Sequence, residues 1–199
     1  MGVEAGPDGK RRCWWCLGSP DYTAYHDDEW GRELHGEAEL FERLTLEAFQ
    51  SGLSWLTILR KRENFRKAFA DFDVERIADY GNDDRARLMA DAGIVRNRAK
   101  IDAAIANARA TRELHAAGET LDELLWGFAP DPDSRPAPRS GKELEPTSPE
   151  STAMAKELKR RGFVFVGPTT AYSTMEAVGM VNDHLAGCEF RELSGRRSS

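Results

Sequence analysis

The chain of 199 residues has a formal net charge of −6, and 40% of its residues are hydrophobic. This length can bury a core and fits one domain. No apolar run approaches the ~20 residues that span a bilayer, and 3 cysteines without an apolar leader do not suit a disulfide-framed secreted protein. We therefore expect a soluble intracellular protein without membrane contact. Its acidic balance opposes non-specific binding to nucleic acid unless basic residues cluster locally.

The predicted elements begin with a flexible leader over residues 1–11, which are Gly-rich and charged. From Glu37 onward, apolar residues recur at helical spacing and predict a helix. Gly52 interrupts this pattern, and a second helix is predicted from about Trp55 into a basic cluster. The N-terminal third therefore contains a helix pair joined by a short turn.

Further helices are predicted along the rest of the chain. Asp73 is the expected cap of a helix over 74–80, and Asp83 is the expected cap of a helix that stops at Gly93. After these we expect an alanine-rich helix over 94–112, a helix over 121–128, a Pro-rich surface loop over 129–149, a helix over 152–161, a buried connection over 163–166 and a helix over 170–180. The pattern predicts an all-α fold with one domain over 12–190 and a basic tail over 191–199.

Metal-type ligands lie near both ends of this domain. Cys13 and His26 are near its start, and His184 and Cys188 near its end stand one helical turn apart. Two thiols and two imidazoles form a complete tetrahedral zinc set, which would join the chain ends. Spacing alone leaves Cys16 open as a ligand in place of His26, and it also permits a Cys-x-x-Cys redox motif, although no βαβ pattern follows it.

A possible nucleic-acid contact lies within residues 84–112, which have the form of a helix-hairpin-helix. Backbone N–H groups around Gly93 would face a DNA phosphate, with Arg96, Arg98 and Lys100 beside it. The alternative is that Gly93 simply ends a helix.

An acidic residue, Glu47, is accompanied by polar-edged aromatic residues. A carboxylate among aromatic rings suits a flat cationic ligand, because the ring faces attract a cation and the carboxylate accepts hydrogen bonds from its edge. The alternative is a solvated glutamate beside core tryptophans. The aromatic residues in question are Trp15, Tyr22, Tyr25, Trp30 and Trp55.

Several motifs, in their order along the chain, resemble the DNA-3-methyladenine glycosylase I family of constitutive bacterial alkylation-repair enzymes. The resemblance extends over about residues 13–188. The motifs are Tyr25-His26-Asp27-Asp28-Glu29-Trp30-Gly31, Gly52-Leu53-Ser54-Trp55, Lys61-Arg62-Glu63-Asn64, Asp91-Ala92-Gly93-Ile94 and Val181-Asn182-Asp183-His184.

The resemblance implies a helix-hairpin-helix DNA glycosylase fold in which a structural zinc ion joins the N- and C-terminal segments. It implies a hydrolase of base-excision repair that flips 3-methyladenine out of double-stranded alkylated DNA and cleaves its N-glycosidic bond. We expect a monomer in the bacterial cytoplasm. The implied zinc ligands are Cys13, His26, His184 and Cys188.

The resemblance also implies roles for pocket and DNA-facing residues. Glu47 would recognise the damaged base and is the catalytic candidate, and Trp55 would stack on the base. Gly52 and Leu53 would fill the gap that the base leaves. Further pocket walls are Trp15, Tyr22 and Tyr25, and the DNA-facing hairpin includes Gly93, Arg96, Arg98 and Lys100.

The expected chemistry is monofunctional. A base methylated at N3 is already cationic and leaves as a neutral molecule, so it needs no proton from the enzyme. Residues 103–109 contain no acid, and no lysine is assigned as a Schiff-base nucleophile. The rival hypotheses are a catalytically inactive, zinc-stapled module that binds damaged DNA, and a zinc deaminase, whose His-x-Glu and Pro-Cys-x-x-Cys signature is missing.

Overall fold

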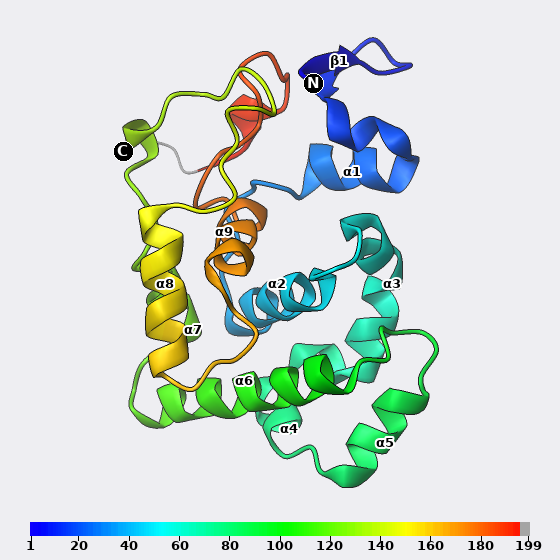
Figure 1. The fold of residues 1–199 in the computed structure, drawn as a ribbon, viewed down its shortest axis with the longest axis vertical. Coiled ribbons are helices and arrows are strands. Elements are labelled where there is room, and N and C mark those ends of the chain that lie inside the picture. The colour runs from blue at the N-terminus through cyan, green and yellow to red at the C-terminus, as the bar shows by residue number, and fades with distance from the viewer. Residues whose placement is uncertain (196–199) are drawn as a thin grey trace.

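The molecule is built mostly of helices (Figure 1). The computed structural model describes residues 1–195. Within that range no helix has the length and apolar character needed to cross a membrane. The elements are β1 (Val3–Ala5), β2 (Arg11–Cys13), α1 (Pro20–Asp28), α2 (Glu37–Gln50), α3 (Trp55–Ala68), α4 (Val74–Ala78), α5 (Asn82–Ala90), α6 (Arg98–Ala116), α7 (Leu121–Trp126), α8 (Pro149–Arg160) and α9 (Pro168–Ala177), with short 3-10 turns η1 (Trp14–Gly18), η2 (Ala70–Phe72), η3 (Pro132–Ser134) and η4 (Arg191–Leu193).

Cap residues set the starts of α4, α5 and α6, and only the start of α4 agrees with the sequence prediction. The Asp73 side chain accepts a hydrogen bond from the Arg76 N–H at 3.1 Å and caps α4 as expected. The prediction for Asp83 was wrong, because Gly81 is the cap residue of α5 and Asp83 lies in the first turn. Likewise, α6 begins later than expected because Asn97 caps it.

The segment expected to be a flexible leader forms a β-hairpin instead. β1 and β2 pair in antiparallel register, with Val3 opposite Cys13. The Arg12 guanidinium is buried and binds both Asp8 and Asp27, so the hairpin is tied to α1. At the other end, Arg191 of the predicted basic tail donates to the Asn182 carbonyl at 2.9 Å. The last residues of that tail, 196–199, lie outside the described range.

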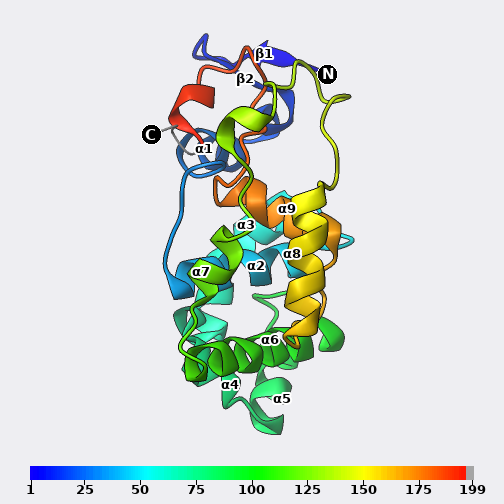
Figure 2. The ribbon, with the colours of Figure 1, turned by 90° about the vertical axis from the view of Figure 1, so that its left-hand side faces the viewer.

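Helix α2 lies at the centre of the fold (Figures 1 and 2). It contacts α3, α6, α7 and α9, and all its residues from Leu40 to Phe49 are buried. Phe49 packs edge-on against Phe65 of α3, with ring centroids 4.8 Å apart. Because α2 has no broad solvent face, the other helices must cover it on several sides.

Two buried side chains of α6 hold neighbouring loops. The Lys100 ammonium donates to the carbonyls of Phe49 and Ser51 at 2.8 and 2.6 Å and so holds the turn after α2. Asn107 bonds both the N–H and the carbonyl of Val164, in the connection between α8 and α9. The sequence predicted that residues 163–166 of this connection are buried. Phe163 and Val166 are buried, but Val164 and Phe165 are exposed.

Replacement of Lys100 tests the first of these contacts. Lys100→Met should lower the free energy of unfolding by about 1–3 kcal/mol, because the buried Phe49 carbonyl and the part-buried Ser51 carbonyl lose a charged donor. Urea unfolding followed by circular dichroism measures the change. Lys156→Met, at an exposed lysine of α8, is the matched control and should change stability by less than about 0.5 kcal/mol. Equal effects in both variants would contradict the assignment.

Candidate functional site

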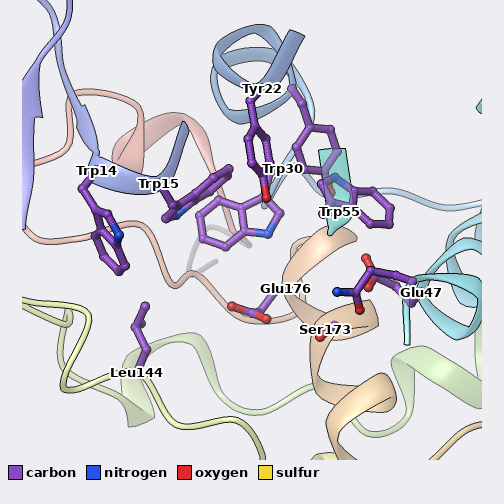
Figure 3. A pocket seen from close by; sticks show the side chains of 11 residues that line it. Trp14, Trp15, Tyr22, Trp30, Glu47, Trp55, Leu144, Ser173 and Glu176 are labelled. Atoms are coloured by element: carbon purple, nitrogen blue, oxygen red, sulfur yellow. The ribbon is translucent and has the colours of Figure 1, made fainter. Parts of the chain in front are cut away.

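An aromatic cavity of about 260 Å³ opens between α1, α2, α3 and α9 (Figure 3). Figure 3 shows aromatic rings from η1, α1 and the start of α3 on one side and polar side chains of α9 on the other. The lining residues are Trp14, Trp15, Tyr22, Tyr25, Trp30, Glu47, Gln50, Trp55, Leu144, Ser173 and Glu176.

The aromatic wall is assembled from segments that are separate in sequence. Trp15 meets Tyr22 and Trp30 edge-on, with ring centroids 5.0 and 4.9 Å apart. Tyr25 lies against Trp55, the first residue of α3, at 5.3 Å. Flat aromatic faces and edges around one cavity suit a planar ligand. The structure thus brings together all the residues that the sequence proposed as pocket walls.

Tyr25 and α1 are held in place by an ion-pair network. Glu29, directly after α1, binds Arg62 of α3 at 2.5 and 2.8 Å and Arg43 of α2 at 2.8 Å. Burial opposes ionisation of Glu29, but the two guanidinium groups prevail and lower its pKa to about 2. The Arg43 guanidinium also lies 5.9 Å from the centre of the Tyr25 ring. This network fixes α1 against both α2 and α3.

Glu47 is the buried acid of this cavity. Its residue is only 7% exposed, and no described residue donates a hydrogen bond to its carboxyl group. Burial raises the pKa of Glu47 to about 8, against a smaller opposite effect of the Arg43 charge. The Trp55 indole N–H in the cavity wall is also buried and has no hydrogen-bond partner among residues 1–195. An acid left unpaired in an aromatic cavity is poised to interact with a cationic, hydrogen-bonding ligand.

The opposite wall consists of residues that the sequence analysis did not identify. Ser173 and Glu176 come from α9, and Leu144 comes from the Pro-rich loop. Burial, together with the charges of Asp183 and Glu47, raises the pKa of Glu176 well above its ordinary value. Ser173 and Glu176 are three positions apart and so share a face of α9, which was the available signal, whereas nothing in the loop sequence indicated Leu144.

A buried cluster of two cysteines and two histidines adjoins the aromatic wall. The ligand atoms of Cys13, His26, His184 and Cys188 all lie within 4.8 Å of one another. The Cys188 sulfur is 3.5 Å from a ring nitrogen of each histidine. Contact with Cys13, and then with both imidazoles, lowers the pKa of the Cys188 thiol despite its burial. Thiolates and neutral imidazoles bind metal ions, so this group could hold one.

The cluster also has the outer hydrogen bonds that orient metal ligands. The second nitrogen of His26 contacts Asp27 at 2.8 Å, and that of His184 contacts the Trp30 carbonyl at 3.1 Å. Cys16 is not one of the four clustered groups, and its thiol donates to the Cys13 carbonyl at 3.1 Å. The His184 ring lies 4.6 Å from the Trp30 ring, so the cluster supports the cavity wall directly.

The residues proposed to face DNA lie on two turns. In the turn after α2, Gly52 has φ +79°, and Leu53 is 39% exposed. In the turn between α5 and α6, the Gly93 N–H donates to Asp91 at 2.7 Å, and a side chain at Gly93 would meet Asn64. Arg96 and Arg98 are exposed. Lys100 is buried, because its ammonium donates a hydrogen bond to the Ser51 carbonyl in the turn after α2.

Comparisons with known proteins agree with this arrangement. The model of the methyladenine glycosylase family matches residues 15–192. The chain is 44% identical over 177 residues to DNA-3-methyladenine glycosylase 1 of Escherichia coli (strain K12), covering 89% of this chain and 95% of that protein.

Solved structures show the same similarity. A crystal structure of 3-methyladenine DNA glycosylase I superposes with a TM-score of 0.84 at 45% identity, covering 89% of this chain and 98% of that one. A variant of 3-methyladenine DNA glycosylase I in complex with 3-methyladenine superposes with a TM-score of 0.83 at 33% identity, covering 90% and 97%. This chain therefore belongs to the methyladenine glycosylase family.

Proposed function

We propose that this protein is a monofunctional DNA-3-methyladenine glycosylase, which hydrolyses the N-glycosidic bond of 3-methyladenine in alkylated double-stranded DNA. The observation that carries the proposal is the unpaired, buried carboxyl group of Glu47 in a cavity walled by aromatic rings. The family membership and the 3-methyladenine complex of a related structure support it. We assign the activity to a monomer in the bacterial cytoplasm.

Glu47 selects the base by charge and by hydrogen bonding. A cationic base favours the ionised carboxylate, which accepts hydrogen bonds from the exocyclic amine of adenine. Guanine presents a carbonyl oxygen at the same position and is repelled. Stacking on Trp55 and between Tyr22 and Tyr25 contributes about 1–3 kcal/mol per base–aromatic contact and offsets the cost of unpairing the base.

Bond cleavage needs water but no acid. The electron pair of the bond between the sugar C1′ and the base nitrogen goes to the cationic base, which leaves neutral, and water adds to C1′ and loses a proton. As the bond lengthens, positive charge moves from the base to the sugar. A carboxylate in the same cavity stabilises this charge, so Glu47 is our candidate for the catalytic group.

We assign the DNA contacts to the two exposed turns. The Gly52–Leu53 turn directly follows the pocket residue Gln50, where it can fill the gap in the duplex. The turn around Gly93 is the hairpin of a helix-hairpin-helix, and the exposed Arg96 and Arg98 lie beside it, where they can approach phosphates; Arg98 is paired with Asp102 at 3.1 Å. Lys100 acts indirectly by holding the first turn.

We further propose that the Cys2His2 cluster holds a structural zinc ion. A tetrahedral zinc ion with sulfur and nitrogen ligands places those atoms about 3.5 Å apart, and the Cys188 sulfur lies 3.5 Å from both histidine nitrogens. Four protein ligands leave no open coordination position, so the ion joins the chain ends and takes no part in the reaction.

Release of free bases from dimethyl-sulfate-treated duplex DNA, resolved by chromatography, tests the activity. The wild type should release 3-methyladenine. Trp55→Ala should lose about 5- to 100-fold in rate from the missing stacking contact, and Glu47→Ala should lose at least as much. Glu113→Ala, at an exposed residue of α6, should match the wild type. A folded, metal-loaded wild type that binds damaged DNA but releases no base would favour an inactive binding module instead.

The pH dependence provides a second test. Because the free enzyme holds the pKa of Glu47 at about 8, kcat/KM for 3-methyladenine release should rise with pH and level off above about 8, as Glu47 ionises. Glu47→Gln should abolish this rise of kcat/KM with pH. Initial rates at low substrate concentration between pH 6 and 9.5, roughly two units around that pKa, measure it.

Protein stability should change in the opposite direction. Folding raises the pKa of Glu47 above its ordinary value of 4.5, so its contribution to stability is fully present below pH 4.5 and is lost as pH rises through about 8. Glu47→Gln should therefore be more stable than the wild type above pH 8 by a few kcal/mol, on the order of 1.4 per pKa unit. An unchanged pH profile of activity and stability in this variant would refute the buried-acid assignment.

Metal analysis tests the zinc site with two matched substitutions. Purified wild type should contain one zinc ion per chain, and Cys188→Ser should contain none and unfold at a lower temperature. Cys16→Ser should keep its zinc, because Cys16 lies outside the four clustered groups. Loss of zinc in Cys16→Ser, or retention in Cys188→Ser, would show that the ligand set is different.

A further inference from the structure

The connection between α8 and α9 exposes two large apolar side chains that no part of the proposed reaction uses. Val164 and Phe165 are each 45% exposed, while their neighbours Phe163 and Val166 are buried. Contiguous exposed apolar surface, unlike a single exposed apolar residue, marks a candidate site for contact with a partner.

The backbone at Phe165 is strained. Its φ of +61° is in the left-handed region, which a bulky side chain rarely adopts and which costs on the order of 1–3 kcal/mol. Nothing inside the protein compensates for this through burial of the ring, since the ring is among the most exposed apolar groups of the described residues. The strained backbone therefore presents the ring outward.

A buried side chain fixes the loop in this shape. Asn107 of α6 is 1% exposed, accepts a hydrogen bond from the Val164 N–H at 2.8 Å and donates to the Val164 carbonyl at 3.1 Å. A two-sided amide clamp of this kind holds one backbone conformation, so the exposed ring is held in position before any partner binds.

The same helix, α6, holds both this loop and the turn that contains Leu53. Lys100, which binds the Ser51 carbonyl, and Asn107 are seven residues apart on α6. Seven residues bring a helix back to nearly the same face about 10 Å further along its axis. In Figure 2 the turn after α2, in cyan, and the connection before α9, in orange, project toward the same side of the molecule.

Each loop is joined in sequence to an element that lines the cavity. Leu53 lies between the lining residues Gln50 and Trp55, and the connection leads into α9, which contributes Ser173. Leu53 and Phe165 are thus exposed apolar residues on segments that lead into two elements of the cavity wall. Apolar wedges of this type insert between or pack on base steps in proteins that deform a duplex.

We propose that Val164 and Phe165 form a second DNA-contacting wedge, which packs against the duplex beside the damaged nucleotide while the Leu53 turn occupies the gap. This inference rests on the proposed function, because the partner is the duplex from which the base is taken. Lys100 and Asn107, which hold the two loops, are about 10 Å apart along the axis of α6, a distance of about three base-pair steps of 3.4 Å. Phe165 would therefore stabilise the distorted flank of the lesion and would not touch the base itself.

Phe165→Gly is the informative variant, because glycine adopts the same backbone angle without strain. The probe is a short duplex containing one tetrahydrofuran abasic-site analogue, with binding measured by fluorescence anisotropy. The dissociation constant should rise roughly tenfold. Binding of free 3-methyladenine, followed by tryptophan fluorescence, should be unchanged, and stability in urea should be equal or higher. Leu193→Gly, at a 51% exposed residue of η4, is the matched control and should bind the duplex as the wild type does.

The outcomes separate this inference from the proposed function. An unchanged duplex affinity in Phe165→Gly, with an active wild type, would overturn the wedge alone. Weaker duplex binding accompanied by lower stability and weaker binding of the free base would overturn it also, because the ring would then serve folding. A wild type that neither binds free 3-methyladenine nor releases it would overturn the proposed function first.

Discussion

The burial of α2 is the constraint on which the rest of the structure depends. A helix that is covered from Leu40 to Phe49 must pair or neutralise every charged side chain within that stretch. Glu42 is paired with Arg66, and Arg43 is paired with Glu29. Glu47 is the exception, since no described residue donates a hydrogen bond to it. The surrounding packing thus isolates one acid, and the cavity forms where that acid points.

This isolation links function to stability. Burial alone raises the pKa of Glu47 to about 8, so the empty pocket favours a neutral acid and disfavours the charged form that a cationic base requires. A cationic ligand supplies the missing partner. In the function that we propose, selectivity for positively charged bases comes from a group that makes the folded protein less stable at high pH, in keeping with the general observation that functional sites depart from the rules of optimal packing.

The two ends of the chain contribute to the same site from a distance. The Cys2His2 cluster brings the end of β2 and helix α1 together with residues 184–188, and its histidines contact Trp15 and Trp30 in the cavity wall. Arg12 and Arg191 reinforce this junction through Asp27 and Asn182. The aromatic wall thus packs against the cluster, whereas Glu47 is a residue of α2. The cavity is lined by residues of both parts.

The sequence by itself determined the helical class, the starts of α2 and α3, the cap of α4 and the motifs that identify the family, because these depend on local spacing and capping. It did not reveal the N-terminal hairpin, whose strands are held by the ion pairs of Arg12, or α1, which is short and polar. Only the tertiary structure decided that Glu47 is unpaired, that Lys100 is buried, and that Ser173 and Glu176 face the aromatic residues. The physical reason is that burial and pairing depend on which distant helices pack against a residue, and local sequence carries no information on that packing.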